Sequence, residues 1–307
     1  MKIGVPKEIK NNEFRVGLTP SSVAELVTFN HDIFIQSNAG LGIGFLDEDY
    51  IKAGAVILDS PSKLYSSAEL IIKVKEPVPE EFKYLNSTHT VFAYLHLAGD
   101  PQTGLDLTAT GITGIALETV TADDGSMPLL SPMSCIAGQL SVIVGSYHLL
   151  KPNKGMGTLV GSFDNIDPRT ITVIGAGVAG TEAIKKAIDN RARLKIIDLS
   201  SERLDELQRD FGNKNIEYIL SSESSIHDAV IDSDLVIGAV YVVGKRAPKV
   251  VDRSMVKNMR PGTVLVDISI DQGGCVETSK PTTHDDPTYL VDDVVHYCVT
   301  NMPGAVP

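Results

Sequence analysis

The chain of 307 residues is poor in cysteine and contains only Cys135, Cys275 and Cys298, which lie far apart. Their number is odd and no metal-type Cys/His spacing surrounds them, so the sequence excludes a disulfide framework and offers no metal site. The opening residues 1–8 (MKIGVPKE) also lack the apolar core of a signal peptide. We therefore expect a reduced, cytoplasmic setting.

Positive charge is scarce as well, since 27 Lys and Arg stand against 39 Asp and Glu and give a formal net charge of −12. This balance argues against nucleic acid or an anionic membrane surface as a partner. Charge is absent altogether from residues 125–150, a length that could span a bilayer. Because prolines, serines and a histidine interrupt that segment, we interpret it as a buried core helix starting near Ser134.

Short β-rich runs alternate with helical stretches along most of the chain. Predicted strands lie at 2–5, 32–36, 55–58, 70–74, 90–97, 113–117, 171–174, 194–197, 216–220, 235–240 and 263–269. Predicted helices lie at 20–29, 178–190, 201–211, 224–231 and 252–259. This alternation predicts an α/β fold with two Rossmann-like domains, whose parallel sheets are separated by a cleft. A polar stretch at 121–125 is typical of a domain boundary, and the length also favours two domains.

The most specific motif is the glycine turn GAGVAG at residues 175–180. An apolar strand runs into it and a helical pattern leaves it, which is the context that a dinucleotide-binding turn requires. Gly175 permits the tight turn, Gly177 allows a pyrophosphate to approach the backbone, and Gly180 allows the helix and strand to pack closely. The alternative is a glycine turn without a ligand.

An acidic residue follows the turn at a suitable distance. Asp198 stands 198 − 180 = 18 residues after Gly180, at the end of the next predicted strand. A carboxylate there accepts hydrogen bonds from the adenosine ribose and repels a 2′-phosphate, which favours NAD over NADP. Arg203 lies nearby and weakens that preference.

Candidate reacting residues lie where predicted strands end, since ligands bind beyond the carboxyl ends of strands in open α/β sheets. Ala239 and Val240 could contact the cofactor through their backbone. Asp271, before two glycines, is either a catalytic carboxylate or a turn residue. Asp267, inside the same apolar strand, is interpreted as a buried structural carboxylate.

Three further candidates lie in the first domain. His96 ends an apolar run and ionises near neutral pH, so it is either a proton-transfer group or a satisfied core histidine. Lys75 follows a strand, and Arg15 lies in the first loop. Either cation could hold a substrate carboxylate, or both could be ordinary solvated residues. Residues alone thus indicate a nicotinamide enzyme with a small anionic substrate.

A set of motifs that covers essentially the whole chain resembles the bacterial alanine dehydrogenase family, which includes the related transhydrogenase alpha subunits. The motifs lie at 4–8, 15–16, 19–20, 73–77, 94–98, 131–134, 173–177, 267–274 and 297–303. The resemblance implies reversible oxidative deamination of L-alanine to pyruvate and ammonia with NAD, in a homohexamer. Glyoxylate is a further expected substrate, because a small pocket cannot strongly reject near-isosteres.

The resemblance also implies the roles of individual residues. His96 and Asp271 are the acid/base pair, and Arg15 and Lys75 bind the substrate. The cofactor positions are Ser134, Gly175, Gly177, Val178, Ala179, Gly180, Asp198, Arg203, Ser221, Ala239, Val240, Ile268, Asp271, Lys280, Val299, Asn301 and Met302. Lys280 departs from the family, which commonly has Arg there.

By the same resemblance, residues 1–130 are the substrate domain, 131–303 the NAD-binding domain, and 304–307 the start of a crossover back to the first domain. The family continues with helices that complete the first domain, so we expect that returning segment to be missing. Two rival functions remain open. One is a transhydrogenase-like NAD(H)-binding subunit, a family that lacks the matching histidine, and the other is a catalytically silent NAD-binding paralogue.

Overall fold

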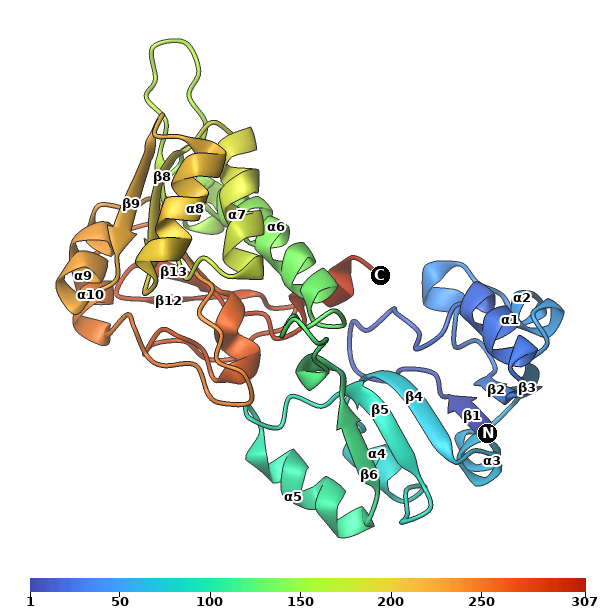
Figure 1. Ribbon diagram of the computed structural model, residues 1–307. Coiled ribbons are helices and arrows are strands. Elements are labelled where there is room, and N and C mark those ends of the chain that lie inside the picture. Colours follow the sequence, from blue (N-terminus) through green and yellow to red (C-terminus); the bar gives the residue numbers. More distant parts are fainter. The chain divides into compact units, whose positions relative to one another are not determined.

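The computed structural model describes residues 1–307, and the chain forms two compact units. We call Met1–Leu130 with Gly304–Pro307 the N-terminal unit, and Ser131–Pro303 the C-terminal unit. Each unit is built on one sheet with helices in the connections between its strands (Figure 1). The predicted α/β class with Rossmann-like units is confirmed.

The N-terminal unit has a parallel sheet of six strands in the order β3-β2-β1-β4-β5-β6. Its strands are β1 (Lys2–Val5), β2 (Asp32–Gln36), β3 (Val56–Leu58), β4 (Leu70–Lys75), β5 (Thr90–Tyr94) and β6 (Thr113–Ala116). Its helices are α1 (Pro20–Thr28), α2 (Asp47–Lys52), α3 (Pro61–Ser67), α4 (Pro79–Phe82) and α5 (Pro101–Thr110). The strand order reverses between β1 and β4, which is the topological switch point where such sheets bind ligands.

Local sequence explains the start of α1. Thr19 has extended backbone and its side chain accepts the Ser22 N–H, while Pro20 occupies the first turn. The helix turns Val23 into an apolar cluster that includes Ile3 and Ile33 of the sheet. Capping and one buried face together therefore fix a helix that the sequence predicted to within one residue.

The C-terminal unit has a sheet of seven strands in the order β12-β13-β11-β10-β7-β8-β9. Its strands are β7 (Thr170–Ile174), β8 (Arg193–Asp198), β9 (Ile216–Leu220), β10 (Leu235–Gly238), β11 (Val264–Asp267), β12 (Thr288–Val291) and β13 (Val294–Tyr297). Its helices are α6 (Ser131–His148), α7 (Val178–Asp189), α8 (Ser201–Phe211), α9 (Glu223–Ile231) and α10 (Arg253–Asn258). Here the switch point lies between β7 and β10.

One edge of this sheet contradicts the expectation of purely parallel pairing. Strand β12 runs antiparallel to β13. The two residues that join them, Asp292 and Asp293, both have positive φ, at 49° and 62°. Positive φ at both central residues is the requirement of a tight two-residue hairpin, and Asp tolerates it better than most residues.

Two predicted strands of this unit are shorter than expected. The strand predicted at 263–269 ends at Asp267 and continues as a 3-10 turn over Ile268–Gln272. The strand predicted at 235–240 ends at Gly238. In the first case the cause is local, because the Asp267 carboxylate accepts the Ser269 N–H and turns the chain out of the sheet.

Most of the uncharged segment at 125–150 forms helix α6, which packs beside α7 (Figure 1). It buries Ala137, Val142 and Gly145, whereas Ile143 and Tyr147 remain 50% and 58% exposed. The expected core helix is therefore buried on one face only. The structure contains no helix whose length and apolar character would allow it to cross a membrane.

Candidate active site

Three charged or titratable candidates of the N-terminal unit meet at its switch point. Arg15 lies in the loop after β1, Lys75 ends β4, and His96 follows β5. Because β1, β4 and β5 are adjacent and parallel, their carboxyl ends share one edge of the sheet. Lys75 and Arg15 both lie near enough to act electrostatically on His96 and to lower its pKa.

The backbone of His96 is unusual. The strand predicted at 90–97 ends at Tyr94, and His96 adopts a left-handed conformation with φ of 49°. Glu118 accepts the backbone N–H groups of His96 at 2.6 Å and of Leu95 at 3.2 Å, in place of a neighbouring strand. A non-glycine residue held in this conformation is typical of functional sites. His96 therefore lies beyond the end of β5, and not inside the strand that the sequence predicts at 90–97.

The environment of the His96 ring keeps it neutral. Burial is the largest cause that lowers its pKa well below 6.5, and the cations Lys75, Lys10 and Arg15 lower the pKa further. The ring also stacks on Tyr94, with 6.1 Å between centroids. A neutral imidazole at pH 7 can accept a proton, which is the property that a general base needs.

Arg15 is held by the residue two positions before it. Glu13 accepts Arg15 Nε at 2.7 Å on one oxygen and Nη2 at 2.6 Å on the other, and it also accepts the Arg15 backbone N–H. The Glu13 side chain is fully buried and that of Arg15 is 11% exposed. This bidentate pair fixes the plane of the guanidinium.

Lys75 is almost fully buried, with an exposed fraction of 4%. The next residue, Glu76, pairs with Lys10 of the first loop. This ion pair fastens the loop that carries Arg15 to the end of β4. The N-terminal unit therefore presents a compact set of cations around one neutral histidine.

The glycine turn of the C-terminal unit joins β7 to α7, next to the switch point between β7 and β10. Gly175 has φ of 93°, and a Cβ there would lie 2.6 Å from the Ala239 carbonyl oxygen. A Cβ on Gly180 would lie 1.9 Å from the Gly175 carbonyl oxygen. By contrast, a Cβ on Gly177 would meet no atom within 4 Å. The fold itself thus requires Gly175 and Gly180 but leaves open space at Gly177, as a backbone approached by a ligand would.

Asp198 ends β8 beside this turn. Its two oxygens accept the N–H groups of Ala176 at 2.7 Å and Ser200 at 2.9 Å. Arg203 donates to the Ala176 carbonyl at 3.0 Å and to Thr181 Oγ1 at 2.8 Å, so it supports the turn from α8. Both residues are near enough to the turn to meet a nucleotide held there.

The remaining cofactor candidates follow the ends of strands β7, β9, β10, β11 and β13, except Ser134 in α6 and Lys280. The parallel strands of the sheet bring these positions to one edge. Lys280 is exposed, and its ammonium lies 4.3 Å from the centre of the Tyr289 ring. Positions at this edge are Val178, Ala179, Ser221, Ala239, Val240, Ile268, Asp271, Val299, Asn301 and Met302.

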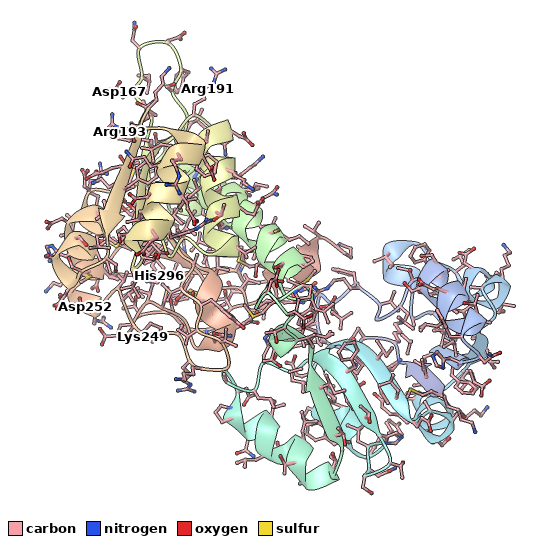
Figure 2. All side chains as sticks on the ribbon, in the orientation of Figure 1. Asp167, Arg191, Arg193, Lys249, Asp252 and His296 are labelled. Atoms are coloured by element: carbon pink, nitrogen blue, oxygen red, sulfur yellow. The ribbon has the colours of Figure 1, made fainter.

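Asp271 lies in the 3-10 turn after β11 and is partly exposed. The chain beyond it is braced on two sides. Asp267 is fully buried and accepts the N–H groups of Cys275 and Val276, as the interpretation of a structural carboxylate requires. Lys249, labelled in Figure 2, donates to three carbonyls of the same segment. Asp271 therefore stands on a well-supported loop.

Other charged groups lie away from these edges. Figure 2 shows Asp167, Arg191 and Arg193 near the amino ends of β7 and β8, where all three are exposed. No group of three or more His, Cys, Asp or Glu residues could hold a metal ion. All three cysteines are free thiols.

Sequence reasoning assigned no role to Glu13 or Glu118, although each fixes a candidate residue. Glu13 lies two residues before Arg15, a spacing visible in the sequence. Glu118 lies 22 residues after His96 and follows the neighbouring strand β6. Only the strand order could reveal this second pair.

The comparisons with known proteins agree with one another. Sequence models described as the N-terminal and C-terminal domains of alanine dehydrogenase/PNT match residues 4–137 and 141–307. Curated alanine dehydrogenases from Halomonas elongata and Mycolicibacterium smegmatis are 49% and 48% identical over 100% of this chain, which spans 82% of each relative.

Solved structures give the same result. An L-alanine dehydrogenase superposes with a TM-score of 0.90 at 49% identity, over 100% of this chain and 84% of that one. A transhydrogenase from Sinorhizobium meliloti superposes with a TM-score of 0.82 at 26% identity, over 100% and 88% of the two chains. The chain therefore belongs to the alanine dehydrogenase/PNT family.

Proposed function

We propose that this protein is an NAD-dependent alanine dehydrogenase, which converts L-alanine and water to pyruvate and ammonium and runs reversibly. The proposal extends to this chain the activity named for its relatives at 48–49% identity. The observation that carries it is a set of three side chains, neutral His96 and the cations Arg15 and Lys75, at the carboxyl ends of adjacent strands. A chain that only bound nucleotide would have no use for that set.

The glycine turn fits a dinucleotide. The open space at Gly177, together with the N-terminus of the twelve-residue helix α7, suits a pyrophosphate. Asp198 at the end of the next strand suits the adenosine ribose. We therefore assign the C-terminal unit to NAD binding and the N-terminal unit to the substrate.

The chemistry divides between cofactor and protein. When bound, NAD accepts the hydride that leaves the alanine α-carbon. The iminium that remains on the substrate adds water, and the carbinolamine then breaks its C–N bond to give pyruvate and ammonia. Water addition releases one proton, departure of the nitrogen takes one up, and formation of the carbonyl releases the hydroxyl proton, so proton carriers are needed at each of these steps.

We assign that proton transfer to His96 and Asp271. His96 can take the proton of the attacking water because its imidazole is neutral, since burial and the nearby cations lower its pKa. Arg15 would bind the substrate carboxylate, and Lys75 would stabilise the charge that develops on the carbonyl oxygen. Fixing the substrate by its carboxylate also aligns the α-carbon for hydride transfer.

The direct test is an assay of the purified chain. L-Alanine and NAD should yield NADH, and pyruvate, ammonium and NADH should yield alanine. Substitution of NADP for NAD should lower kcat/KM because Asp198 repels a 2′-phosphate. Glyoxylate should replace pyruvate with reduced efficiency.

Two results would contradict the proposal. Protein that binds NADH and yet turns over neither alanine nor pyruvate would be a silent nucleotide-binding member of the family. Hydride exchange between nucleotides without any amino acid would indicate a transhydrogenase-like function.

We further propose a cytoplasmic homo-oligomer, in particular a hexamer. The free thiols suit a reducing compartment. Ile143 and Tyr147 leave apolar surface on α6 that a second copy could cover. Light scattering on the purified chain measures the number of subunits, and a monomer would contradict the assembly.

A further inference from the structure

Strand β4 is irregular just before Lys75. Ile72 pairs with Phe92 of β5, and Lys75 pairs with Tyr94, so three steps along β4 match two steps along β5. One residue is therefore extra, which makes a β-bulge. Bulges occur beside active sites because they redirect the side chain that follows them.

The bulge also lacks a partner on its other side. The pairing of β4 with β1 ends at Gly4 and Ile71, so no strand of the sheet covers Val74 or Lys75 there. Buried N–H groups need an acceptor, and without one the bulge would be costly. The side chain that takes the place of β1 belongs to Glu8.

Glu8 lies three residues after the end of β1. Its Oε1 accepts the backbone N–H groups of Val74 at 2.6 Å and of Lys75 at 3.3 Å. Its Oε2 lies 3.1 Å from Lys73 Nζ. The Glu8 side chain is 3% exposed, so these contacts are made away from water.

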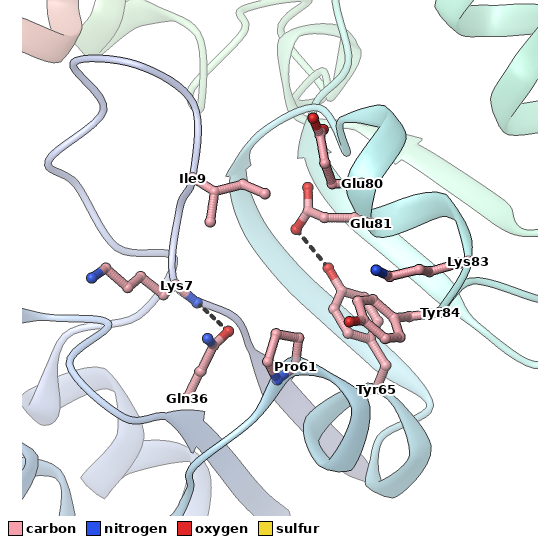
Figure 3. Close-up of a pocket in the computed structure, with 9 residues that line it drawn as sticks. All are labelled: Lys7, Ile9, Gln36, Pro61, Tyr65, Glu80, Glu81, Lys83 and Tyr84. Carbon is pink, nitrogen blue, oxygen red and sulfur yellow. Dashed lines mark hydrogen bonds between the residues drawn. The ribbon is translucent and has the colours of Figure 1, made fainter.

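A buried network holds this carboxylate in place. Lys73 Nζ is also 2.8 Å from Glu81 Oε1, which accepts the Tyr65 hydroxyl. Figure 3 shows the Tyr65–Glu81 bond and a second one, from the Lys7 N–H to Gln36, which fixes the backbone next to Glu8. The small hollow drawn there is lined by none of the candidate active-site residues.

We propose that Glu8 is a positioning residue for Lys75: its carboxylate completes the β4 bulge and so fixes where the Lys75 side chain starts. This inference rests on the substrate-binding role proposed above for Lys75. Loss of the acceptor would leave the Val74 and Lys75 N–H groups unpaired and would let the backbone at Lys75 shift. A slip of one residue moves a strand position by about 3.3 Å and turns its side chain to the other face.

The test compares two substitutions of Glu8 with one matched control. Glu8→Met removes the acceptor at similar length, and Glu8→Gln keeps an acceptor oxygen but removes the charge. The control, Glu81→Gln, weakens the other ion pair of Lys73, and Glu81 makes no contact with the backbone N–H groups of Val74 or Lys75.

In steady-state assays, Glu8→Met should lower kcat/KM for pyruvate about 100-fold, since misplacement of a binding group by ~1 Å can cost that much. KM for NADH should stay unchanged. Glu8→Gln should lose less than Glu8→Met, and Glu81→Gln should stay within about twofold of wild type. In a Lys75→Ala background, Glu8→Met should have little further effect on kcat/KM.

Hydrogen exchange of the backbone amides tests the same idea without turnover. Val74 and Lys75 should exchange slowly in wild type and in Glu81→Gln, and fast in Glu8→Met. Protected amides in Glu8→Met, or an equal loss of pyruvate kinetics in Glu8→Met and Glu81→Gln, would overturn the positioning role. If wild type shows no pyruvate turnover, the proposed function fails instead, and fast exchange in Glu8→Met still shows that Glu8 fixes the Lys75 backbone.

Discussion

The two units share one architecture but carry different functional groups at their switch points. Each has a doubly wound sheet whose strand order reverses once, between β1 and β4 in the N-terminal unit and between β7 and β10 in the C-terminal unit. At the first switch point stand charged side chains. At the second stand a glycine turn and backbone groups. The same topology therefore serves one site built from side chains and another built from the main chain.

The difference shows what each kind of site demands of its surroundings. The cations and the histidine of the N-terminal unit need buried acceptors, which Glu8, Glu13 and Glu118 supply. The glycine turn needs space instead, because Gly175 and Gly180 are packed against carbonyl oxygens. Changes of charge should thus harm the first site, and added volume should harm the second.

The largest effect is expected from His96→Ala. Loss of a general base lowers turnover by about 10²–10⁴-fold, so kcat for alanine oxidation should fall by that amount. Binding of NADH, measured by its fluorescence, should remain unchanged because the glycine turn lies in the other unit. His227→Ala, at an exposed histidine of α9, is the control. A variant with normal kcat would remove His96 from the mechanism.

Gly177→Val is expected to weaken NADH binding, which His96→Ala leaves unchanged. The protein has no atom near the new Cβ, so the unfolding temperature should hardly change. The side chain would fill the space that we assign to the pyrophosphate. NADH should therefore bind about 100-fold more weakly, which is a loss of about 2.7 kcal/mol. Unchanged NADH affinity would place the cofactor elsewhere.

Gly180→Ala should act on stability instead. Its Cβ would lie 1.9 Å from the Gly175 carbonyl oxygen, and backbone cannot yield as a flexible side chain does. Overpacking of this kind costs about 1–3 kcal/mol. Urea unfolding should show that loss in Gly180→Ala and little or none in Gly177→Ala. Equal stability of the two variants would mean that α7 shifts freely on β7.

Much of this comparison could be predicted from the sequence. The runs of apolar residues predicted strands β1–β11, three of them too long by two or more residues at the carboxyl end, and the motif at 175–180 predicted the glycine turn. The hairpin of β12 and β13 was not predicted because its turn is Asp292-Asp293, without the glycine that usually marks such turns. Strand ends were also missed where a side chain replaced a strand as the hydrogen-bond partner.

The same side chains that accept hydrogen bonds in place of a strand are the site residues that sequence reasoning missed. Residues at or just beyond the ends of strands, such as Lys75 and His96, could be found from the pattern of apolar runs alone. Their partners Glu8 and Glu118 could not, since 67 and 22 residues separate them from the N–H groups they accept. Such pairs become neighbours only through the order of the strands in the sheet, and the pattern of a single sequence does not show that order.

The smallest effect concerns the charges around His96. Lys10 is one of the cations that lower the His96 pKa, so Lys10→Met should raise that pKa toward 6.5. Loss of the Lys10 ion pair also leaves the Glu76 carboxylate to act in the same direction. Alanine oxidation needs neutral His96, so the acid limb of kcat/KM should move to higher pH. Lys7→Met removes a charge from the same loop that does not act on His96 and should leave the profile in place. A shift toward lower pH in Lys10→Met would show that a group other than His96 sets this limb.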